Sequence, residues 1–195
     1  MAELLQQLVT RQAGRRPDAV ALVMNDERMR YAELEEASNR LARQLRAVGC
    51  VRGDRVCFLT PKSPSAVVIE LGILKADCAY VPLDPSNPAP RLAKIIAACE
   101  PRCVLVAGPA AQSLRDALAG ASLGAAPLIG SLDAEAPPAP GLKVEFSRGD
   151  LAGFSGAPLD YRNHGSDTAH ILFTSGSTGS PKGVQITHDN ALRFI

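Results

Sequence analysis

The sequence lacks a strong excess of either charge. Its 21 lysine and arginine residues nearly balance 20 aspartate and glutamate residues, which leaves a formal net charge of +1. A protein that binds nucleic acid or an anionic membrane through bulk electrostatics is typically far more basic. We therefore expect no nucleic-acid partner and no membrane partner, and the partner has to be inferred from a specific site.

The chain also lacks a long hydrophobic run. Its longest apolar stretch, 66–74, contains Glu70 and is far shorter than the roughly 20 residues that span a bilayer. Gln6 and Gln7 interrupt the apolar positions near the N-terminus, a pattern that is not typical of a secretory signal. With 46% hydrophobic residues, the 195-residue chain is predicted to form a packed core.

No two cysteines have the C-x-x-C spacing that is typical of zinc and redox sites. Most of them lie in apolar runs such as Val56–Leu59, where cysteine behaves as a small hydrophobic residue. We predict buried structural thiols in a reducing cytoplasm, and no metal site. The five cysteines are Cys50, Cys57, Cys78, Cys99 and Cys103.

Apolar periodicity predicts alternating strands and helices along most of the chain. The predicted helices cover 4–14, 32–48, 65–75, 90–98 and 112–119. The predicted strands cover 20–24 and 28–30 as a hairpin, and then 55–59, 79–81, 102–106 and 126–129. This β-α-β alternation predicts an α/β fold with a mostly parallel β-sheet flanked by helices, preceded by a leading helix within 1–15.

Two segments are rich in proline, glycine or asparagine. The proline-rich stretch 133–141 and the stretch 155–167 are predicted to be surface loops within one domain. Near the C-terminus, Asp189 or Asn190 is predicted to cap a helix that has barely begun at Ile195. Because this apolar helical pattern is unfinished, we expect the chain to be a fragment.

A glycine- and serine-rich loop, LFTSGSTGSPKG at 172–183, follows an apolar strand-like run. Backbone N–H groups in such a loop can converge on an anion, and the glycines permit close approach. Lys182 adds a mobile positive charge that is suited to phosphate. An ordinary hairpin turn is the alternative, but such turns need only roughly two to five residues. The composition therefore favours a phosphate-binding loop.

This loop differs from the Walker-type pattern G-x-x-x-x-G-K-[ST]. Counted from Gly176, Pro181 stands in place of the second glycine, and Gly183 in place of the hydroxyl residue that binds magnesium. The residues at 183–187 alternate like a strand, whereas a Walker-type loop leads into a helix. A strand–loop–strand phosphate clamp is therefore favoured over a Walker-type ATPase.

Three segments carry a family resemblance. FTSGSTGSPKGV at 173–184 resembles the phosphate-loop signature of the adenylate-forming superfamily, which comprises acyl-CoA synthetases, luciferases and nonribosomal peptide synthetase adenylation domains. LKADCAYVPLDPS at 74–86 resembles the second core motif of amino-acid adenylation domains, except that Asp77 stands where glycine is usual. RYAEL at 30–34 resembles the region before the first core motif. The resemblance covers about 16–195.

The resemblance implies that 1–195 is the N-terminal portion of the large subdomain of an AMP-forming ligase. Such enzymes use ATP and Mg²⁺ to convert a carboxylate into an acyl-adenylate and pyrophosphate. The acyl group then usually passes to coenzyme A or to a carrier protein's phosphopantetheine thiol. The family's acyl pocket and magnesium-binding acid are expected outside this chain. We therefore expect the fragment alone to be inactive without the missing remainder of the enzyme.

The resemblance also assigns roles to individual residues. Tyr80–Pro85 is expected to be structural, with Asp84 capping the following turn. His188 is a candidate for the active-site wall, while His164 and His170 are expected to be incidental. The phosphate-binding role falls on Thr174, Ser175, Gly176, Ser177, Thr178, Gly179, Lys182 and Gly183.

Two other interpretations remain open at this point. The chain could be a non-catalytic nucleotide-binding or interaction module that keeps the fold, or one half of a split enzyme. Nucleotide binding without turnover would favour the module, and a second chain carrying the missing motifs would favour the split enzyme.

Overall fold

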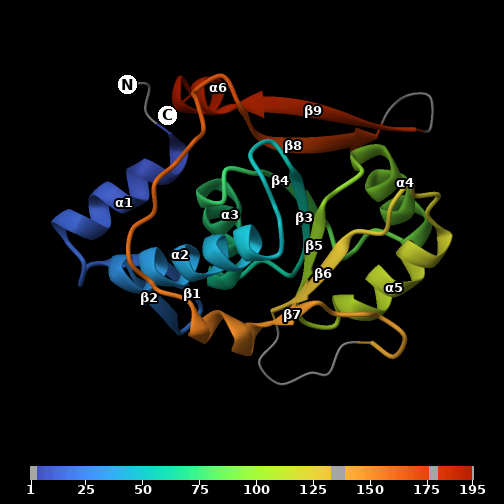
Figure 1. The fold of residues 1–195 in the computed structure, drawn as a ribbon, viewed down its shortest axis with the longest axis horizontal. Helices are drawn as coiled ribbons and strands as arrows, with labels where there is room; N and C mark the ends of the chain where they lie inside the picture. Colours follow the sequence, from blue (N-terminus) through green and yellow to red (C-terminus); the bar gives the residue numbers. More distant parts are fainter. Residues whose placement is uncertain (1–3, 133–138, 176–179, 195) are drawn as a thin grey trace.

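The computed structural model describes residues 4–132, 139–175 and 180–194, and its central feature is a seven-stranded sheet (Figure 1). The strand order is β7-β6-β5-β3-β4-β8-β9, and every neighbouring pair is parallel except the antiparallel pair β8–β9. This confirms the predicted α/β fold. The strands are β3 (Arg55–Leu59), β4 (Ala79–Leu83), β5 (Cys103–Val106), β6 (Leu128–Ser131), β7 (Phe146–Ser147), β8 (Thr168–Ser175) and β9 (Pro181–Thr187).

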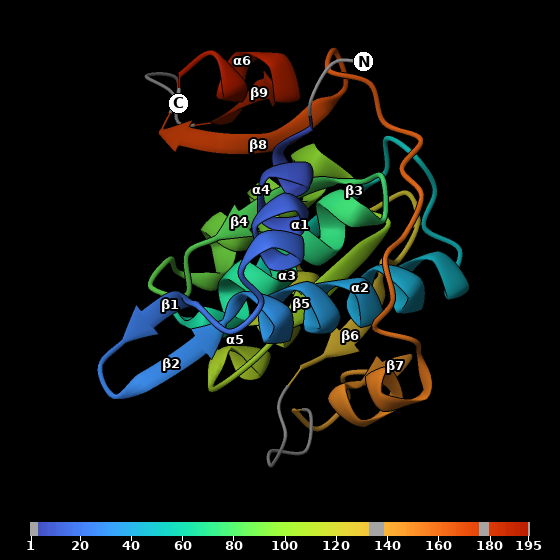
Figure 2. The same ribbon diagram turned by 90° about the vertical axis from the view of Figure 1, so that its left-hand side faces the viewer.

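Helices cover both faces of this sheet. One face packs against α2 (Tyr31–Ala47) and α3 (Pro64–Lys75), and the other against α4 (Ala89–Cys99) and α5 (Ala110–Gly120). The leading helix α1 (Leu5–Arg15) lies outside α2 and α3, as Figure 2 shows. The remaining elements are the hairpin β1 (Val20–Met24) and β2 (Glu27–Arg30), the 3₁₀ helix η1 (Arg148–Gly153) and α6 (His188–Leu192).

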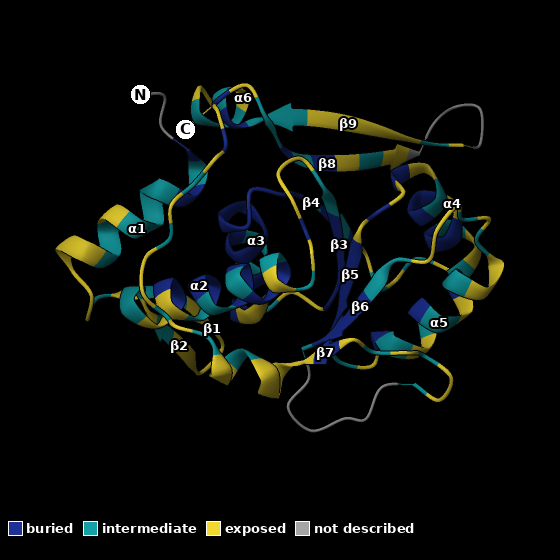
Figure 3. Ribbon diagram, viewed as in Figure 1, coloured by how far each residue is buried: buried dark blue, intermediate teal, exposed yellow. Residues whose placement is uncertain are grey.

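The central strands show why the sheet is buried on both faces. In β3, Val56 and Phe58 pack toward α2 and α3, whereas Cys57 and Leu59 pack toward α4 and α5. Because successive side chains point to opposite faces, a continuous apolar strand fills two hydrophobic clusters at once. Figure 3 shows the resulting buried centre. All five cysteines are free and buried, which confirms the prediction that they lie in the core.

The turn between α3 and β4 explains the departure from the family motif. Asp77 has a φ of 66°, in the left-handed region that favours glycine. Its carboxylate accepts hydrogen bonds from the backbone N–H groups of Arg162 and Asn163, at 2.7 and 3.1 Å. Arg46 Nη2 lies 2.8 Å from the same carboxylate. Aspartate therefore adopts the glycine-like conformation and also fixes the loop at 155–167.

Most predicted element boundaries agree with the structure within a few residues. The strand expected at 126–129 lies at Leu128–Ser131, and the short elements β7 and η1 were not predicted. The expected cap of the last helix was wrong, because the Thr187 side chain accepts the hydrogen bond from the Asn190 N–H. Of the predicted loop 133–141, residues 133–138 lie outside the described residues, and the remainder contains a turn.

Candidate functional site: the β8–β9 hairpin

The predicted phosphate loop connects two paired antiparallel strands. In the register of β8 and β9, Thr174 lies opposite Lys182 and Ser175 lies opposite Pro181. This confirms the expected strand–loop–strand arrangement. Four of the predicted site residues, Gly176, Ser177, Thr178 and Gly179, lie outside the described residues. Because β8 runs parallel to β4, the loop leaves from the edge where open α/β sheets bind ligands.

The pairing places two polar side chains on one face of the hairpin. Directly opposed residues in an antiparallel pair share a face, so Thr174 and Lys182 lie together at the base of the loop. Both residues are exposed. Within the described chain, no carboxylate forms an ion pair with Lys182. A hydroxyl donor and an ammonium group are thus available to an anion held by the loop.

The opposite face of the hairpin contains a close contact between Phe173 and Gly183. Phe173 packs against the cluster formed with α4 and α5, and Gly183 lies directly across from it. A Cβ atom at Gly183 would come within 3.0 Å of Ile171 Cγ2 and 3.1 Å of Phe173 Cζ. These distances give Gly183 a packing role, because the Phe173 ring occupies the space of a side chain. Its part in phosphate binding stays a prediction.

The histidines lie differently from the sequence-based expectation. His188 is completely buried, so it does not line an open wall. Its Nδ1 accepts a hydrogen bond from the Leu5 N–H at 3.3 Å. His170 stacks on Tyr80 with ring centroids 5.0 Å apart, and burial lowers its pKa. This stack joins β4 to β8 and was not predicted, because nothing in the sequence shows that those strands are neighbours.

In the second motif, the strand end and the turn capped by Asp84 lie where they were predicted. Asp84 Oδ1 accepts hydrogen bonds from the Ser86 N–H and hydroxyl, each at 2.8 Å, and so caps the turn after β4. These hydrogen bonds lower the pKa of Asp84. β4 pairs with β8 at Tyr80 and His170. Pro82 lies further along β4 and has no N–H group that could add a hydrogen bond to this pairing.

Metal-binding side chains do not converge in the described part of the chain. No group of three or more histidine, cysteine, aspartate or glutamate residues there has an arrangement that could hold a metal ion. Among the same residues, no helix is both long and apolar enough to cross a membrane.

Comparisons with known proteins agree on one family. The sequence model of a family described as "AMP-binding enzyme" matches residues 9–195. Isonitrile lipopeptide synthase of Mycobacterium tuberculosis is 38% identical over 98% of this chain and 7% of that protein. Bacitracin synthase 1 of Bacillus licheniformis is 36% identical over 98% of this chain and 3% of that protein. The chain thus spans 7% or less of these two relatives.

Solved structures have the same fold. A nonribosomal peptide synthetase, FmoA3, matches with a TM-score of 0.75 and 30% identity over 96% of this chain and 17% of that chain. A benzoate CoA ligase from Burkholderia xenovorans matches with a TM-score of 0.81 and 20% identity. That match covers 98% of this chain and 36% of the ligase.

Proposed function

The chain belongs to the AMP-binding enzyme family, and from this membership we propose that it supplies the phosphate-binding hairpin of an AMP-forming carboxylate ligase in the cytoplasm. The observation that carries the proposal is the β8–β9 pairing, in which Thr174 and Lys182 share one exposed face. Ser175, Gly176, Ser177, Thr178 and Gly179 complete the cradle in this proposal, and Gly183 closes its base.

The proposed reaction explains why such a hairpin is needed. A carboxylate oxygen attacks the α-phosphorus of ATP, giving an acyl-adenylate while pyrophosphate leaves. Negative charge grows on the leaving group, and fixed N–H groups with a nearby ammonium stabilise that charge. Lys182 and Thr174 therefore bind and orient the β- and γ-phosphates. Mg²⁺ would neutralise further phosphate charge when bound with ATP, and in this proposal the acidic residue that binds it lies outside these 195 residues.

The relatives suggest the substrate class. Peptide and lipopeptide synthases and CoA ligases are among the matched proteins, so we propose an amino acid or another acyl acid as substrate. The acceptor is a phosphopantetheine thiol on a carrier protein or the thiol of coenzyme A. The chain spans only 36% of the benzoate CoA ligase. We accordingly propose that these 195 residues bind ATP but need the remainder of such an enzyme for adenylation.

Equilibrium binding of MgATP to the 195-residue chain tests the hairpin's role. Lys182→Gln should weaken binding roughly tenfold, which is the size of one lost charge-assisted hydrogen bond. Lys143→Gln, which changes an exposed lysine outside the hairpin, should leave binding unchanged. Equal affinities for all three proteins would refute the proposed role of Lys182.

A second measurement separates binding from turnover. We expect no carboxylate-dependent exchange of pyrophosphate into ATP by the 195-residue chain. Exchange would show that this chain is catalytically sufficient, while leaving the phosphate-binding role of the hairpin intact. Binding of ATP that fails to support turnover even with the remainder of the enzyme would favour the non-catalytic module.

A further inference from the structure

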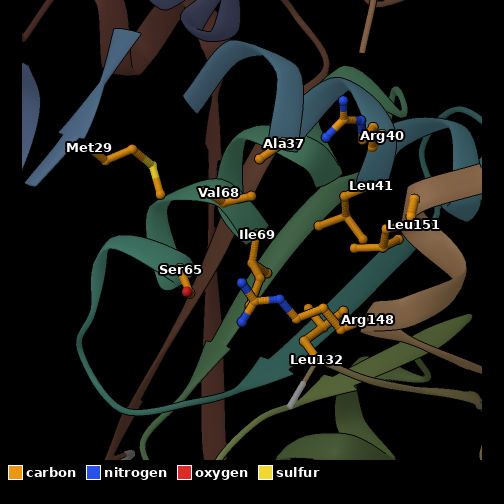
Figure 4. A pocket seen from close by; sticks show the side chains of 11 residues that line it. Met29, Ala37, Arg40, Leu41, Ser65, Val68, Ile69, Leu132, Arg148 and Leu151 are labelled. Carbon is orange, nitrogen blue, oxygen red and sulfur yellow. The ribbon is translucent and has the colours of Figure 1, made fainter. Parts of the chain in front are cut away.

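A pocket of about 260 Å³ lies between α2, α3 and η1, on the face of the sheet opposite α4 and α5 (Figure 4). None of the described residues that line it belongs to β8, β9 or α6. It is therefore separate from the hairpin that we assign to phosphate binding, and its occupation can be tested independently of that assignment.

The pocket lies at the end of the sheet where α/β folds place their ligands. Three of its residues follow the carboxyl ends of strands: Ser65 at the start of the helix after β3, Leu132 directly after β6, and Arg148 directly after β7. Ligands of open α/β sheets bind outside these carboxyl ends, because the connecting loops diverge there. The topology thus favours a binding site at this position.

Apolar side chains form most of the pocket wall. Leu41 on α2 and Ile69 on α3 are each 1% exposed and form its base. Leu132 and Leu151 are partly buried and pack against the same hydrophobic cluster. A ligand that enters here would place an apolar body against these four side chains and release water from them.

Polar groups also line the pocket: the Ser65 hydroxyl, and the guanidinium groups of Arg148 and Arg40 on different sides of it. Within the described chain, the Arg148 guanidinium has no hydrogen bond or ion pair, and Figure 4 shows it reaching into the hollow below Ile69. Arg40 Nε is buried without an acceptor, while its Nη2 lies 3.3 Å from Glu36. Asp150, close to Arg148 in the sequence, instead accepts hydrogen bonds from the Ser147 N–H and hydroxyl.

We propose that this pocket binds a compact organic acid, with its apolar body against the leucine and isoleucine side chains and its carboxylate at Arg148. No acidic residue is among the described residues of the lining, so the positive charge there is uncompensated except by Glu36. The planar guanidinium fork matches a carboxylate in two parallel hydrogen bonds. The volume is just below the usual range of about 300–1,000 Å³, which restricts the ligand to a small acid.

The test uses 3-phenylpropanoate as the probe and the ¹⁵N-labelled 195-residue chain. We expect saturable shifts of the backbone amide signals of Val68, Leu132 and Leu151. The uncharged analogue 3-phenylpropan-1-ol should bind at least tenfold more weakly. Arg148→Gln should weaken binding of the acid roughly tenfold, because one charge-assisted pair is lost. The matched control Arg28→Gln, in the exposed β1–β2 hairpin, should bind the acid like the parent chain.

A second variant keeps the test independent of the arginine. Ala37→Phe places a large ring in the lining and should abolish the shifts, with the far-ultraviolet circular dichroism of the chain unchanged. Equal binding of acid and alcohol would overturn the proposed carboxylate recognition. Shifts confined to Thr174 and Lys182 would place the acid at the hairpin and would overturn the proposed pocket.

Discussion

Asp77 shows how a single residue balances backbone strain against contacts. A non-glycine residue in the left-handed region costs roughly 1–2 kcal/mol, although aspartate tolerates it better than most. Against this cost stand the Arg46 ion pair and two backbone N–H donors, all directed at a carboxylate that is 2% exposed. Hydrogen bonds to charged groups contribute about 1.5–3 kcal/mol each, so the contacts outweigh the strain.

Asp77→Gly should therefore destabilise the protein, although glycine is the usual residue at this position of the motif that 74–86 resembles. We expect the free energy of unfolding in urea to fall by about 2 kcal/mol, since relief of strain offsets only part of the lost hydrogen bonding. Amide hydrogen exchange at Arg162 and Asn163 should accelerate. Asp77→Asn keeps an acceptor oxygen, so its free energy of unfolding should fall less than that of Asp77→Gly. An unchanged or increased stability for Asp77→Gly would contradict this account.

The sequence alone supports only part of this picture. The family motif marks 77 as a position that usually has glycine, which implies a positive φ. It does not reveal that Arg46 and the loop at 155–167 supply the compensating contacts, because these partners come together only in the folded chain. The pocket arginines Arg40 and Arg148 were missed for the same reason: they are far apart in sequence and belong to no motif.

Among the elements, the β8–β9 hairpin depends on one close contact. Gly183→Ala would insert a methyl group where the Phe173 ring and Ile171 leave about 3 Å. Overpacking of this kind typically costs 1–3 kcal/mol, so we expect lower stability and, through the displaced strand, weaker MgATP binding. Urea unfolding and nucleotide titration measure the two effects. Gly124→Ala is the matched control, since nothing lies within 4 Å of its added Cβ. Equal losses in both variants would contradict the packing role.

The three helices α1, α2 and α3 meet at a buried polar cluster. Lys75 Nζ is completely buried and lies 2.7 Å from Glu35 Oε2. It also donates to Ser38 Oγ and Asn39 Oδ1, each at 2.8 Å. Thr10 of α1 donates to the same Glu35 carboxylate. The cluster is fully satisfied around the ammonium, which explains how a lysine can remain in the core.

Removing the ammonium should therefore be costly. Lys75→Met leaves the Glu35 carboxylate largely buried without its cation, and breaking such a pair typically costs about 3–5 kcal/mol. Replacing both partners, Lys75→Met with Glu35→Leu, should recover part of the loss. The free energies of unfolding of the two single variants and the double variant form a cycle that measures the coupling. Additive single effects would show that the ion pair does not connect these helices energetically.

Apolar periodicity largely predicts which segments are helices and which are strands, but it does not predict which of them lie side by side. Long helices such as α2 and buried strands such as β3 carry strong patterns, and both were predicted within a few residues. β7 and η1 have two and six residues, too few to show a period. The strand–loop–strand form of the hairpin was predictable because alternation resumes after the glycine-rich loop. Its pairing with β4 at Tyr80 and His170 was not.

Across the whole molecule, His188 connects the two ends of the described chain. It begins α6, and its Nδ1 accepts the N–H of Leu5, the first residue of α1. A neutral imidazole carries one proton, so Nε2 then carries the N–H. Nε2 lies 3.3 Å from the amide of Asn163, whose oxygen has no other hydrogen-bond partner among the described groups. An amide turned with its oxygen toward Nε2 satisfies both groups.

Protonation of His188 should therefore undo this connection. In an imidazolium, Nδ1 also carries a proton, so it can no longer accept the hydrogen bond from the Leu5 N–H. Burial lowers the pKa of His188 below its ordinary value of 6.5. Asp167 and Asp189 act in the opposite direction, but burial dominates. Because the unfolded chain binds the proton more readily, stability should be retained above about pH 6.5 and decline as the pH falls toward the folded pKa. From this residue, the free energy of unfolding should change by at most about 1.4 kcal/mol per pH unit.

His188→Gln isolates this contribution, since glutamine offers an acceptor oxygen but does not titrate. The variant should show a smaller loss of unfolding free energy between about pH 7 and pH 5. Burial also lowers the pKa of His170, which should account for part of the pH dependence that remains in this variant.

Hydrogen exchange at the Leu5 amide is a second measurement of this connection. After correction for the intrinsic effect of pH on the exchange rate, the Leu5 amide of the parent chain should exchange faster on acidification. His188→Gln should suppress that change. The same substitution at the exposed His164 is the control. A slope that is identical in parent and His188→Gln would show that the α1–α6 connection is not coupled to histidine protonation.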